Sequence, residues 1–391
     1  MSCLRYLVAL LVLIPIAGLA SNPTEDLQSK LDKGTARLEW VKGSGYLRAV
    51  LKQLNIPVSS QTLVFSKTSL QSERISPKTP RAIYFNDDTY VAWVQGAALL
   101  EIMSVDPKTG SAFYVLNQEP DGKPLFERST GHECSVCHFV QQAAPKFVPR
   151  LMFTSVIPDT TGDQGSAFPI DITDRSPMSE RWGGWYVTGT HGTQRHLGNI
   201  VLPRPSTAFA KIPPAEMDKA ANLADLSTRF DIKPYLSPGS DIVALMVLAH
   251  QVEVQNLIAL VSGKPNATPK DVGEPLLKAM LFSGAVPLTS PIRGSSTFTA
   301  DFAALGPKDK QGRSLREFDL KTRLFRYPLS YLIYSKPFDA MPDPVRAYVY
   351  QRLKEVLNGT DKTPAFAHLS TADRTAILGI LKDTKPEFAN R

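Results

Sequence analysis

The residues best suited to carry chemistry lie together in the segment Cys-Ser-Val-Cys-His, at positions 134–138. Two thiols three positions apart, followed at once by an imidazole, form the Cys-x-x-Cys-His pattern of c-type haem attachment. In that chemistry Cys134 and Cys137 bond to the two vinyl groups of one haem, and His138 ligates the iron. The sequence therefore predicts one covalently bound haem c, held by these three residues.

Two other chemistries compete for the same residues. A thiol–disulfide oxidoreductase would use Cys134 and Cys137 as a redox pair, but that fold places the pair at a helix start directly after a strand. Here a polar, loop-like stretch from Glu119 to Ser129 comes first. A zinc site would need further ligands, and the chain has no second cysteine pair. Haem attachment is the favoured prediction, and dithiol chemistry is its main non-haem alternative.

The second axial ligand of the iron is less constrained. A His or Met ligand favours electron transfer, whereas an open position permits small-molecule chemistry. His250 is the first candidate because it lies midway along a long apolar helical segment, and Met246 competes with it from the same helix face. His191 and His196 are further candidates, as ligands or as proton donors. Each of these residues could instead be an ordinary part of the core.

The segment from Arg181 to Asn199 is rich in glycine and aromatic residues. Arg181 and Arg195 could pair with haem propionates, because a guanidinium group binds a carboxylate in a bidentate manner. Trp182 and Trp185 offer flat surfaces for packing in a haem pocket. The alternative is a glycine-rich surface loop whose aromatic side chains are buried as ordinary core.

The rest of the chain predicts an α+β scaffold for these residues. Residues 61–130 are β-rich, 131–150 carry the haem motif, 151–239 are irregular, and 240–391 are mainly helical. No convincing linker separates these regions, so we expect one large domain over 21–391.

Particular strands and helices are predicted within these regions. Apolar residues flanked by turn residues predict four strands, at 82–85, 90–94, 98–105 and 111–116. The longest helix is predicted from Ser240, which can cap it, to about Ser262. Other helical stretches are predicted within 21–60, after Thr268-Pro269, at 343–358, and at 370–383, where Ser370 and Asp373 resemble a capping box.

The N-terminus predicts export. Residues 1–20 have a basic Arg5, the apolar run Leu7–Ile14 and a small-residue cleavage site ending at Ala20, which is the pattern of a signal peptide. We therefore expect a periplasmic protein, and no later segment is predicted to span a membrane. The formal net charge is +7 without a dense run of Lys or Arg, so nucleic acid is not an expected partner.

Beyond the motif, the chain resembles a group of large, poorly characterised bacterial monohaem c-type cytochromes with a cytochrome c domain. The resemblance rests on Arg81–Asp87, Arg181–Tyr186, the pair His250-Gln251, and Ser330–Ser335. It implies haem binding and export for a chain much longer than a small class I cytochrome c, and leaves the reaction open.

Three functions use the same haem. The first is electron transfer to a periplasmic redox partner protein, with a closed six-coordinate iron. The second is a haem enzyme acting on peroxide or another small periplasmic molecule at an open distal site, with His191, His196 or His250 as acid–base group. The third is a ligand-binding sensor that uses the open iron without turnover.

Overall fold

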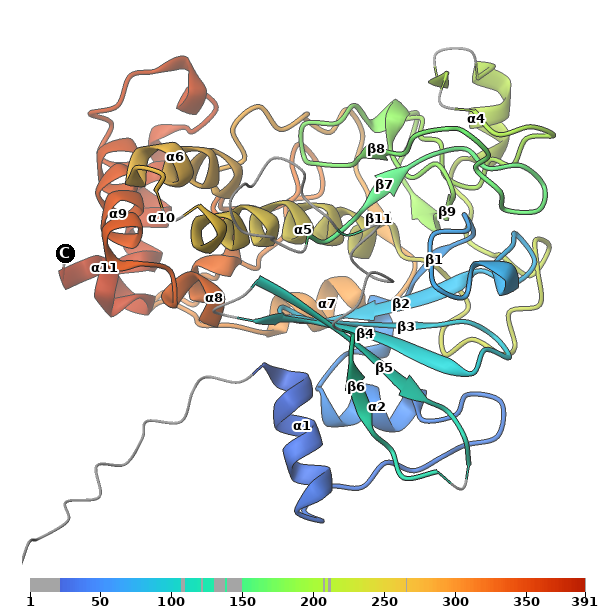
Figure 1. The fold of residues 1–391 in the computed structure, drawn as a ribbon. Coiled ribbons are helices and arrows are strands. Elements are labelled where there is room, and N and C mark those ends of the chain that lie inside the picture. The colour runs from blue at the N-terminus through green and yellow to red at the C-terminus, as the bar shows by residue number, and fades with distance from the viewer. Residues whose placement is uncertain are drawn as a thin grey trace, which may run out of the picture.

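The computed structural model describes residues 22–106, 110–120, 122–129, 138, 150–206, 208–209, 212–264 and 266–390. The predicted signal peptide and both motif cysteines, Cys134 and Cys137, lie outside these residues, whereas His138 lies within them. The fold is α+β, as the sequence predicts: one antiparallel sheet lies between two small N-terminal helices and a larger helical layer (Figure 1).

The sheet has seven strands in the order β6-β5-β4-β3-β2-β1-β9. Its four longest strands, β2 to β5, match the four strands predicted from the sequence. The short strands β1 and β9 were not predicted, and their pairing brings the region after residue 180 onto the sheet edge. The strands are β1 (Thr62–Val64), β2 (Arg81–Phe85), β3 (Thr89–Trp93), β4 (Leu99–Asp106), β5 (Gly110–Asn117), β6 (Phe126–Arg128) and β9 (Trp185–Tyr186).

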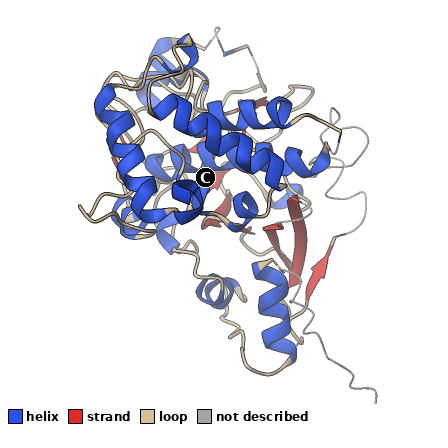
Figure 2. Cartoon of the chain, turned by 90° about the vertical axis from the view of Figure 1, so that its left-hand side faces the viewer, coloured by secondary structure: helices blue, strands red, loops and turns tan. Residues whose placement is uncertain are grey.

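The two faces of the sheet enter different hydrophobic cores, because successive side chains on a strand point in opposite directions. On β2, Tyr84 packs with α1 (Pro23–Asp32) and α2 (Leu47–Gln53), whereas its neighbour Phe85 packs with the helical layer. Figure 2 shows the same layering from the side, with the strands between the two sets of helices.

The central element of the helical layer is α5, which runs over Ile242–Gly263. Its N-cap is Asp241, whose carboxylate accepts the amides of Val243 and Ala244. The predicted cap, Ser240, is wrong by one position, because its hydroxyl instead accepts the amide of Leu63 on β1. The helix end is therefore fixed to the sheet as well as capped.

Helix α5 is apolar almost all the way round, and residues 242–250 are all buried. By length and composition its segment Ile242–Val261 could cross a membrane, which corrects the expectation that no later segment would qualify. In the described part of the chain it is the one helix of this kind, and 89% of its apolar window is buried inside the fold. A helix enclosed in a protein core has this composition for the same reason that a spanning helix does.

The C-terminal helices pack on α5 and on one another. Helix α6 (Pro269–Met280) contacts both α5 and α9 (Asp343–Leu357), and α10 (Thr371–Thr384) lies beyond them. The predicted capping box of Ser370 and Asp373 is confirmed at the start of α10. The remaining elements are short: α4 (Pro214–Ala220), α7 (Phe298–Ala304), α8 (Lys336–Asp339), α11 (Pro386–Asn390), β7 (Thr154–Ser155), β8 (Ile170–Asp171), β10 (Gly189–Thr190) and β11 (Arg293–Gly294).

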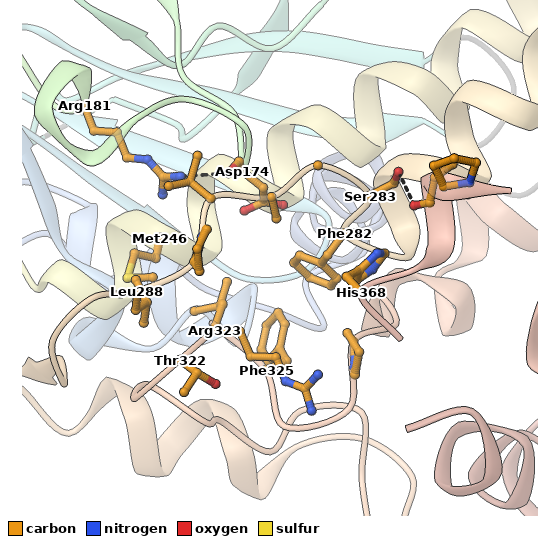
Figure 3. A pocket seen from close by; sticks show the side chains of 18 residues that line it. Asp174, Arg181, Met246, Phe282, Ser283, Leu288, Thr322, Arg323, Phe325 and His368 are labelled. Atoms are coloured by element: carbon orange, nitrogen blue, oxygen red, sulfur yellow. Dashed lines mark hydrogen bonds between the residues drawn. The ribbon is translucent and has the colours of Figure 1, made fainter. Parts of the chain in front are cut away.

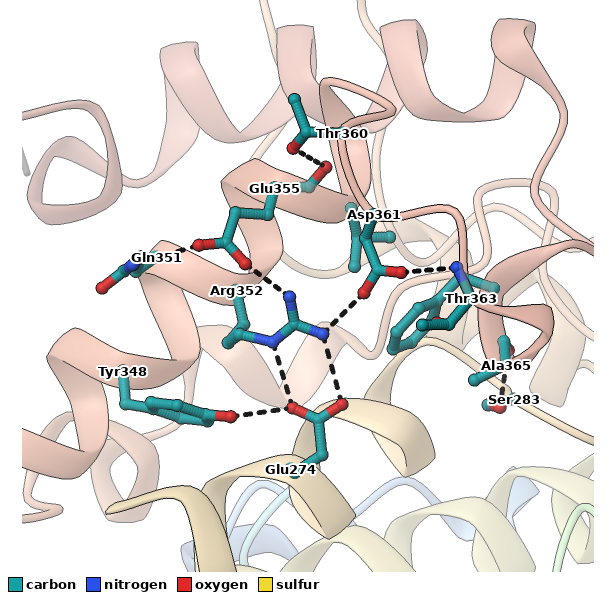
Figure 4. Close-up of polar contacts among 12 residues, drawn as sticks. Glu274, Ser283, Tyr348, Gln351, Arg352, Glu355, Thr360, Asp361, Thr363 and Ala365 are labelled. Carbon is teal, nitrogen blue, oxygen red and sulfur yellow. Dashed lines mark hydrogen bonds and ion pairs between the residues drawn. The ribbon is translucent and has the colours of Figure 1, made fainter.

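One arginine joins the outer helices. Arg352 of α9 pairs with Glu274 of α6 at 3.1 Å, with Asp361 at 2.6 Å and with Glu355 (Figure 4). Burial acts to raise the pKa of Asp361, but hydrogen bonds from Thr363 and the contact with Arg352 outweigh it and hold the pKa at about 2. The carboxylate is therefore ionised and committed to this network at neutral pH.

Candidate functional site

His138 is the one residue of the Cys-x-x-Cys-His motif that the structure describes. Its ring lies 4.6 Å from that of Phe113 on β5, measured between ring centroids. Its Nδ1 lies 2.8 Å from the backbone carbonyl oxygen of Arg150. Because a carbonyl only accepts, Nδ1 carries the proton and donates it. Nε2 is then the lone-pair nitrogen, and it has no recorded hydrogen bond to any described residue.

The imidazole of His138 is held in its neutral form. Burial lowers its pKa; the hydrogen bond to Arg150 opposes this shift, and the positive charge of Arg81 adds to it. A neutral imidazole is the form that ligates metals.

The segment Arg150-Leu151, whose first carbonyl contacts His138, is held in place by contacts of both residues. The guanidinium of Arg150 pairs with Asp171 of β8 at 2.9 Å. The next residue, Leu151, exchanges two backbone hydrogen bonds with the amide side chain of Asn256 on α5, at 2.8 and 3.0 Å. The carbonyl that orients His138 is therefore anchored to the central helix.

Two arginines near His138 each have an unsatisfied donor. Arg81 of β2 pairs with Glu101 of β4 at 3.2 Å, with both side chains mostly buried. The Nε atoms of Arg81 and Arg150 are buried, and neither has a hydrogen-bond partner among the described residues. Buried donors normally have an acceptor. Two such donors near one imidazole fit an acceptor-rich group such as a carboxylate.

His250 lies elsewhere, in a network of its own. It is fully buried, and its ring stacks on that of Phe282 at 4.2 Å. Its Nδ1 lies 2.6 Å from Oδ2 of Asp174, and its Nε2 lies 2.8 Å from Oγ of Ser330. As an iron ligand, His250 would have to give up one of these two bonds.

The atoms of Ser330, His250 and Asp174 are connected as in a Ser-His-Asp catalytic triad. No sequence motif announces this arrangement, since its members are separated by 76 and 80 residues. A nucleophile must be reachable, however, and Ser330 is 0% exposed. Its hydroxyl oxygen also accepts the amide of Leu332. We therefore interpret the three side chains as a structural clamp.

Met246 and Arg181 line a cavity of about 710 Å³ beside this clamp (Figure 3). Arg181 is 4% exposed, and it donates to the backbone carbonyls of Ser176 and Asp174, each at 2.9 Å. Burial lowers the pKa of Arg181, and the charge of Asp174 opposes this shift. The predicted propionate partner is thus a cavity residue in the structure.

His191 and His196 form a buried pair with ring centroids 4.6 Å apart. Nε2 of His191 accepts the amide of Asn222 at 3.0 Å. Burial, together with the charge of His191, lowers the pKa of His196 to about 3. Both nitrogens of His196, Nδ1 of His191 and Nε1 of Trp182 have no hydrogen-bond partner among the described residues. Trp182 also has a left-handed backbone, with φ of 69°.

The last two candidates have ordinary partners. Trp185 donates its indole N–H to the carbonyl of Thr154 and packs on Phe153 at 4.7 Å. Arg195 is an exposed residue that holds Asp218 in a bidentate pair, at 2.7 and 2.9 Å.

No recorded contact among the described residues joins His138 to the other candidates. The sequence located the motif but missed Phe113, Arg81 and the carbonyl of Arg150. A backbone carbonyl has no signature in the sequence, and the pairing of Phe113 with the motif depends on the sheet. In the described ranges no group of three or more His, Cys, Asp or Glu could hold a metal ion, and the motif cysteines fall outside those ranges.

Comparison with known proteins adds no relative. No family model matches the chain, and no curated protein and no solved structure shows significant similarity to it. The arguments on function therefore depend on the motif and on the geometry of the described residues.

Proposed function

We propose that this protein is an exported c-type cytochrome with one haem attached to Cys134 and Cys137, ligated by His138, and that it transfers electrons. The observation that supports the proposal beyond the motif is the 2.8 Å hydrogen bond from Nδ1 of His138 to the carbonyl of Arg150. Metal-ligating histidines characteristically donate their other ring N–H to a carbonyl or carboxylate, which fixes the tautomer and the ring orientation. Here that bond leaves Nε2 free for the iron.

The described residues suit such a group in two further ways. Phe113 packs on the imidazole and limits its rotation. The unpartnered Nε–H groups of Arg81 and Arg150 could donate to the haem propionates, a role that the sequence analysis gave to Arg181 and Arg195. A bound haem would supply a one-electron couple between ferric and ferrous iron. The chain would set its potential through burial, the hydrogen bond on His138 and the two positive charges.

The direct test is an absorption spectrum of the mature protein, recorded oxidised, dithionite-reduced, and reduced with carbon monoxide. We expect a sharp α-band in the reduced spectrum that does not shift with carbon monoxide. The haem itself should remain with the protein after acid–acetone extraction. The matched control is the double variant Cys134→Ser/Cys137→Ser, which should lack covalent haem. No haem in the wild-type protein, from a strain that matures other c-type cytochromes, would overturn the proposal.

A haem enzyme with an open distal site is the second candidate. It is favoured by the engagement of both nitrogens of His250 and by the lack of any recorded contact between His138 and the other candidate ligands among the described residues. A clear carbon monoxide shift in the same spectrum would move this candidate ahead. Turnover of peroxide would then be the activity to assay.

A further inference from the structure

A cavity of about 710 Å³ lies beside the clamp, and the proposed function does not use it. This volume lies within the range of small-molecule sites, about 300–1,000 Å³. Most of its wall is apolar, and the polar groups are few. The apolar side chains that line it include Met246, Phe282, Leu288, Leu324 and Phe325.

The cavity contains one cation without an ion-pair partner. Arg181 donates to two neutral backbone carbonyls, and no described carboxylate lies within ion-pair distance of it. Its Nη1 makes no recorded hydrogen bond to a described residue. The nearest acid is Asp174, whose Oδ2 is already bonded to His250 at 2.6 Å. A buried positive charge without a direct counter-charge is costly, and an anion in the cavity would relieve that cost.

The other polar groups of the cavity are already committed. Arg323 forms a bidentate pair with Asp373, at 2.5 and 3.1 Å. His368 uses Nε2 to contact the carbonyl of Leu281 at 2.7 Å. In Figure 3 Arg181 and His368 lie on opposite sides, with Phe282 between them. The available positive charge is therefore single and lies at one side of an apolar space.

The backbone of Phe282 gives a second, independent indication. It has a φ of 57°, which is a genuine outlier for a bulky side chain. This conformation holds the Phe282 ring flat on His250 at 4.2 Å while the residue lines the cavity. Strained residues of this kind cluster at ligand-binding sites.

We propose that this cavity binds a small amphipathic carboxylate, whose carboxyl group pairs with Arg181 and whose hydrocarbon or aromatic part contacts the apolar wall. One available cation suits a monoanion better than a phosphate, because a second negative charge would have no partner and would lie near the carboxylate of Asp174. A guanidinium group recognises a carboxylate through two parallel hydrogen bonds. None of the cavity residues makes a recorded contact with His138 among the described residues, so this proposal is argued separately from haem binding.

The test is isothermal titration calorimetry of the mature haem-loaded protein with octanoate, and with 1-octanol as the uncharged probe. We expect one saturable octanoate site and at least tenfold weaker binding of octanol. Arg181→Gln should weaken octanoate binding at least tenfold, and Arg181→Lys by less. The matched control is Arg195→Gln, which removes an exposed arginine already paired with Asp218 and should leave the affinity unchanged.

Three results would overturn the proposal. They are the absence of a saturable octanoate site, equal affinity for octanoate and octanol, and unchanged octanoate affinity in a folded Arg181→Gln variant. If that variant does not fold, the comparison of the two probes on the wild-type protein decides the matter. Octanoate binding that appears only in the haem-free variant Cys134→Ser/Cys137→Ser would indicate that a haem propionate occupies the cavity. That result would also contradict the proposal.

Discussion

The imidazole of His250 and the carboxylate of Asp174 are joined by a 2.6 Å hydrogen bond in the centre of the helical layer. On its other side the same ring is bonded to Ser330, so three segments far apart in the chain meet at one residue of α5. All of the hydrogen-bonding capacity of the ring is used. The bond to Asp174 therefore stabilises the core, and we assign it no catalytic role.

Replacing His250 should destabilise the protein strongly. His250→Leu removes both bonds and leaves the buried carboxylate of Asp174 without its partner, at a cost of about 3 kcal/mol in the free energy of unfolding. Urea denaturation measures the difference. His368→Leu is the matched control, because this exposed histidine makes one bond to a carbonyl, and its loss should cost less than about 1 kcal/mol.

The burial of Ser330 in the same clamp predicts that its hydroxyl is unreactive. A fluorophosphonate probe should not label Ser330, because its hydroxyl is fully buried and also accepts the amide of Leu332. Mass spectrometry of the intact protein and of its peptides would check this. Stoichiometric labelling that is lost in both Ser330→Ala and Asp174→Asn would instead show a working triad.

The stability of the protein should fall in acid partly because of His196. Its pKa is about 3 in the fold against 6.5 for an unperturbed histidine, chiefly because burial disfavours the charged form. The unfolded chain therefore binds a proton that the folded chain does not, so stability is complete above pH 6.5 and is lost as the pH falls towards 3. Over the interval from pH 7 to pH 4 this amounts to about 3 kcal/mol.

His196→Phe should flatten this dependence, since phenylalanine keeps the ring and cannot titrate. Urea unfolding at pH 7 and pH 4 would give the difference for both proteins. An equally steep loss in the variant would mean that His196 is not protonated on unfolding in this range. His368→Phe is a suitable comparison, because that ring is exposed.

Replacing Arg352 should lower the free energy of unfolding more than replacing an exposed arginine that makes similar ion pairs. Arg352→Met leaves Glu274 and the buried Asp361 without their common partner, and we expect a loss of about 2 kcal/mol in unfolding free energy. Arg195→Met breaks a bidentate pair whose two side chains are about half exposed to solvent, and it should have little effect on the free energy of unfolding. Equal effects of the two substitutions would contradict the structural role of the network in Figure 4.

On the proposed function, Arg81 should help to set the midpoint potential of the haem. Arg81→Gln removes a positive charge close to His138 and leaves Glu101 unpaired. Both changes favour ferric iron, so the midpoint potential should fall by tens of millivolts, where about 59 mV corresponds to a tenfold change in the equilibrium. Spectroelectrochemical titration would measure it. Arg128→Gln, at an exposed pair with Glu25, should leave the potential unchanged.

The sequence predicted the elements that have a clear local pattern. Strands β2 to β5 are stretches of five to eight residues that are rich in apolar side chains and flanked by turn residues, and the capping box of α10 is readable from Ser370 and Asp373 alone. Strand β9 has only two residues, too few for any periodicity to show. Its place beside β1 follows from tertiary packing, which a local pattern does not contain.

The candidate site likewise has one part that could be predicted from the sequence and another that could not. The Cys-x-x-Cys-His motif is contiguous and could be found directly, whereas the contacts of His138 come from a strand and from a backbone carbonyl. The partners of His250 lie 76 and 80 residues away, so its hydrogen bonds could not be read from the helix that carries it. Residue type alone did not distinguish a free imidazole from an engaged one.

The anchoring of the chain on both sides of the motif bears on how the protein matures. Before the motif, the amide of Ser129 bonds to the carbonyl of Phe113 on β5, and after it Leu151 is held by Asn256 of α5. The first anchor needs β5 and β6 to be paired, and the second needs α5 in place. On the proposed function, haem attachment to the two thiols would be easiest on the exported chain before these anchors form, so that cofactor loading would precede the final docking of the motif.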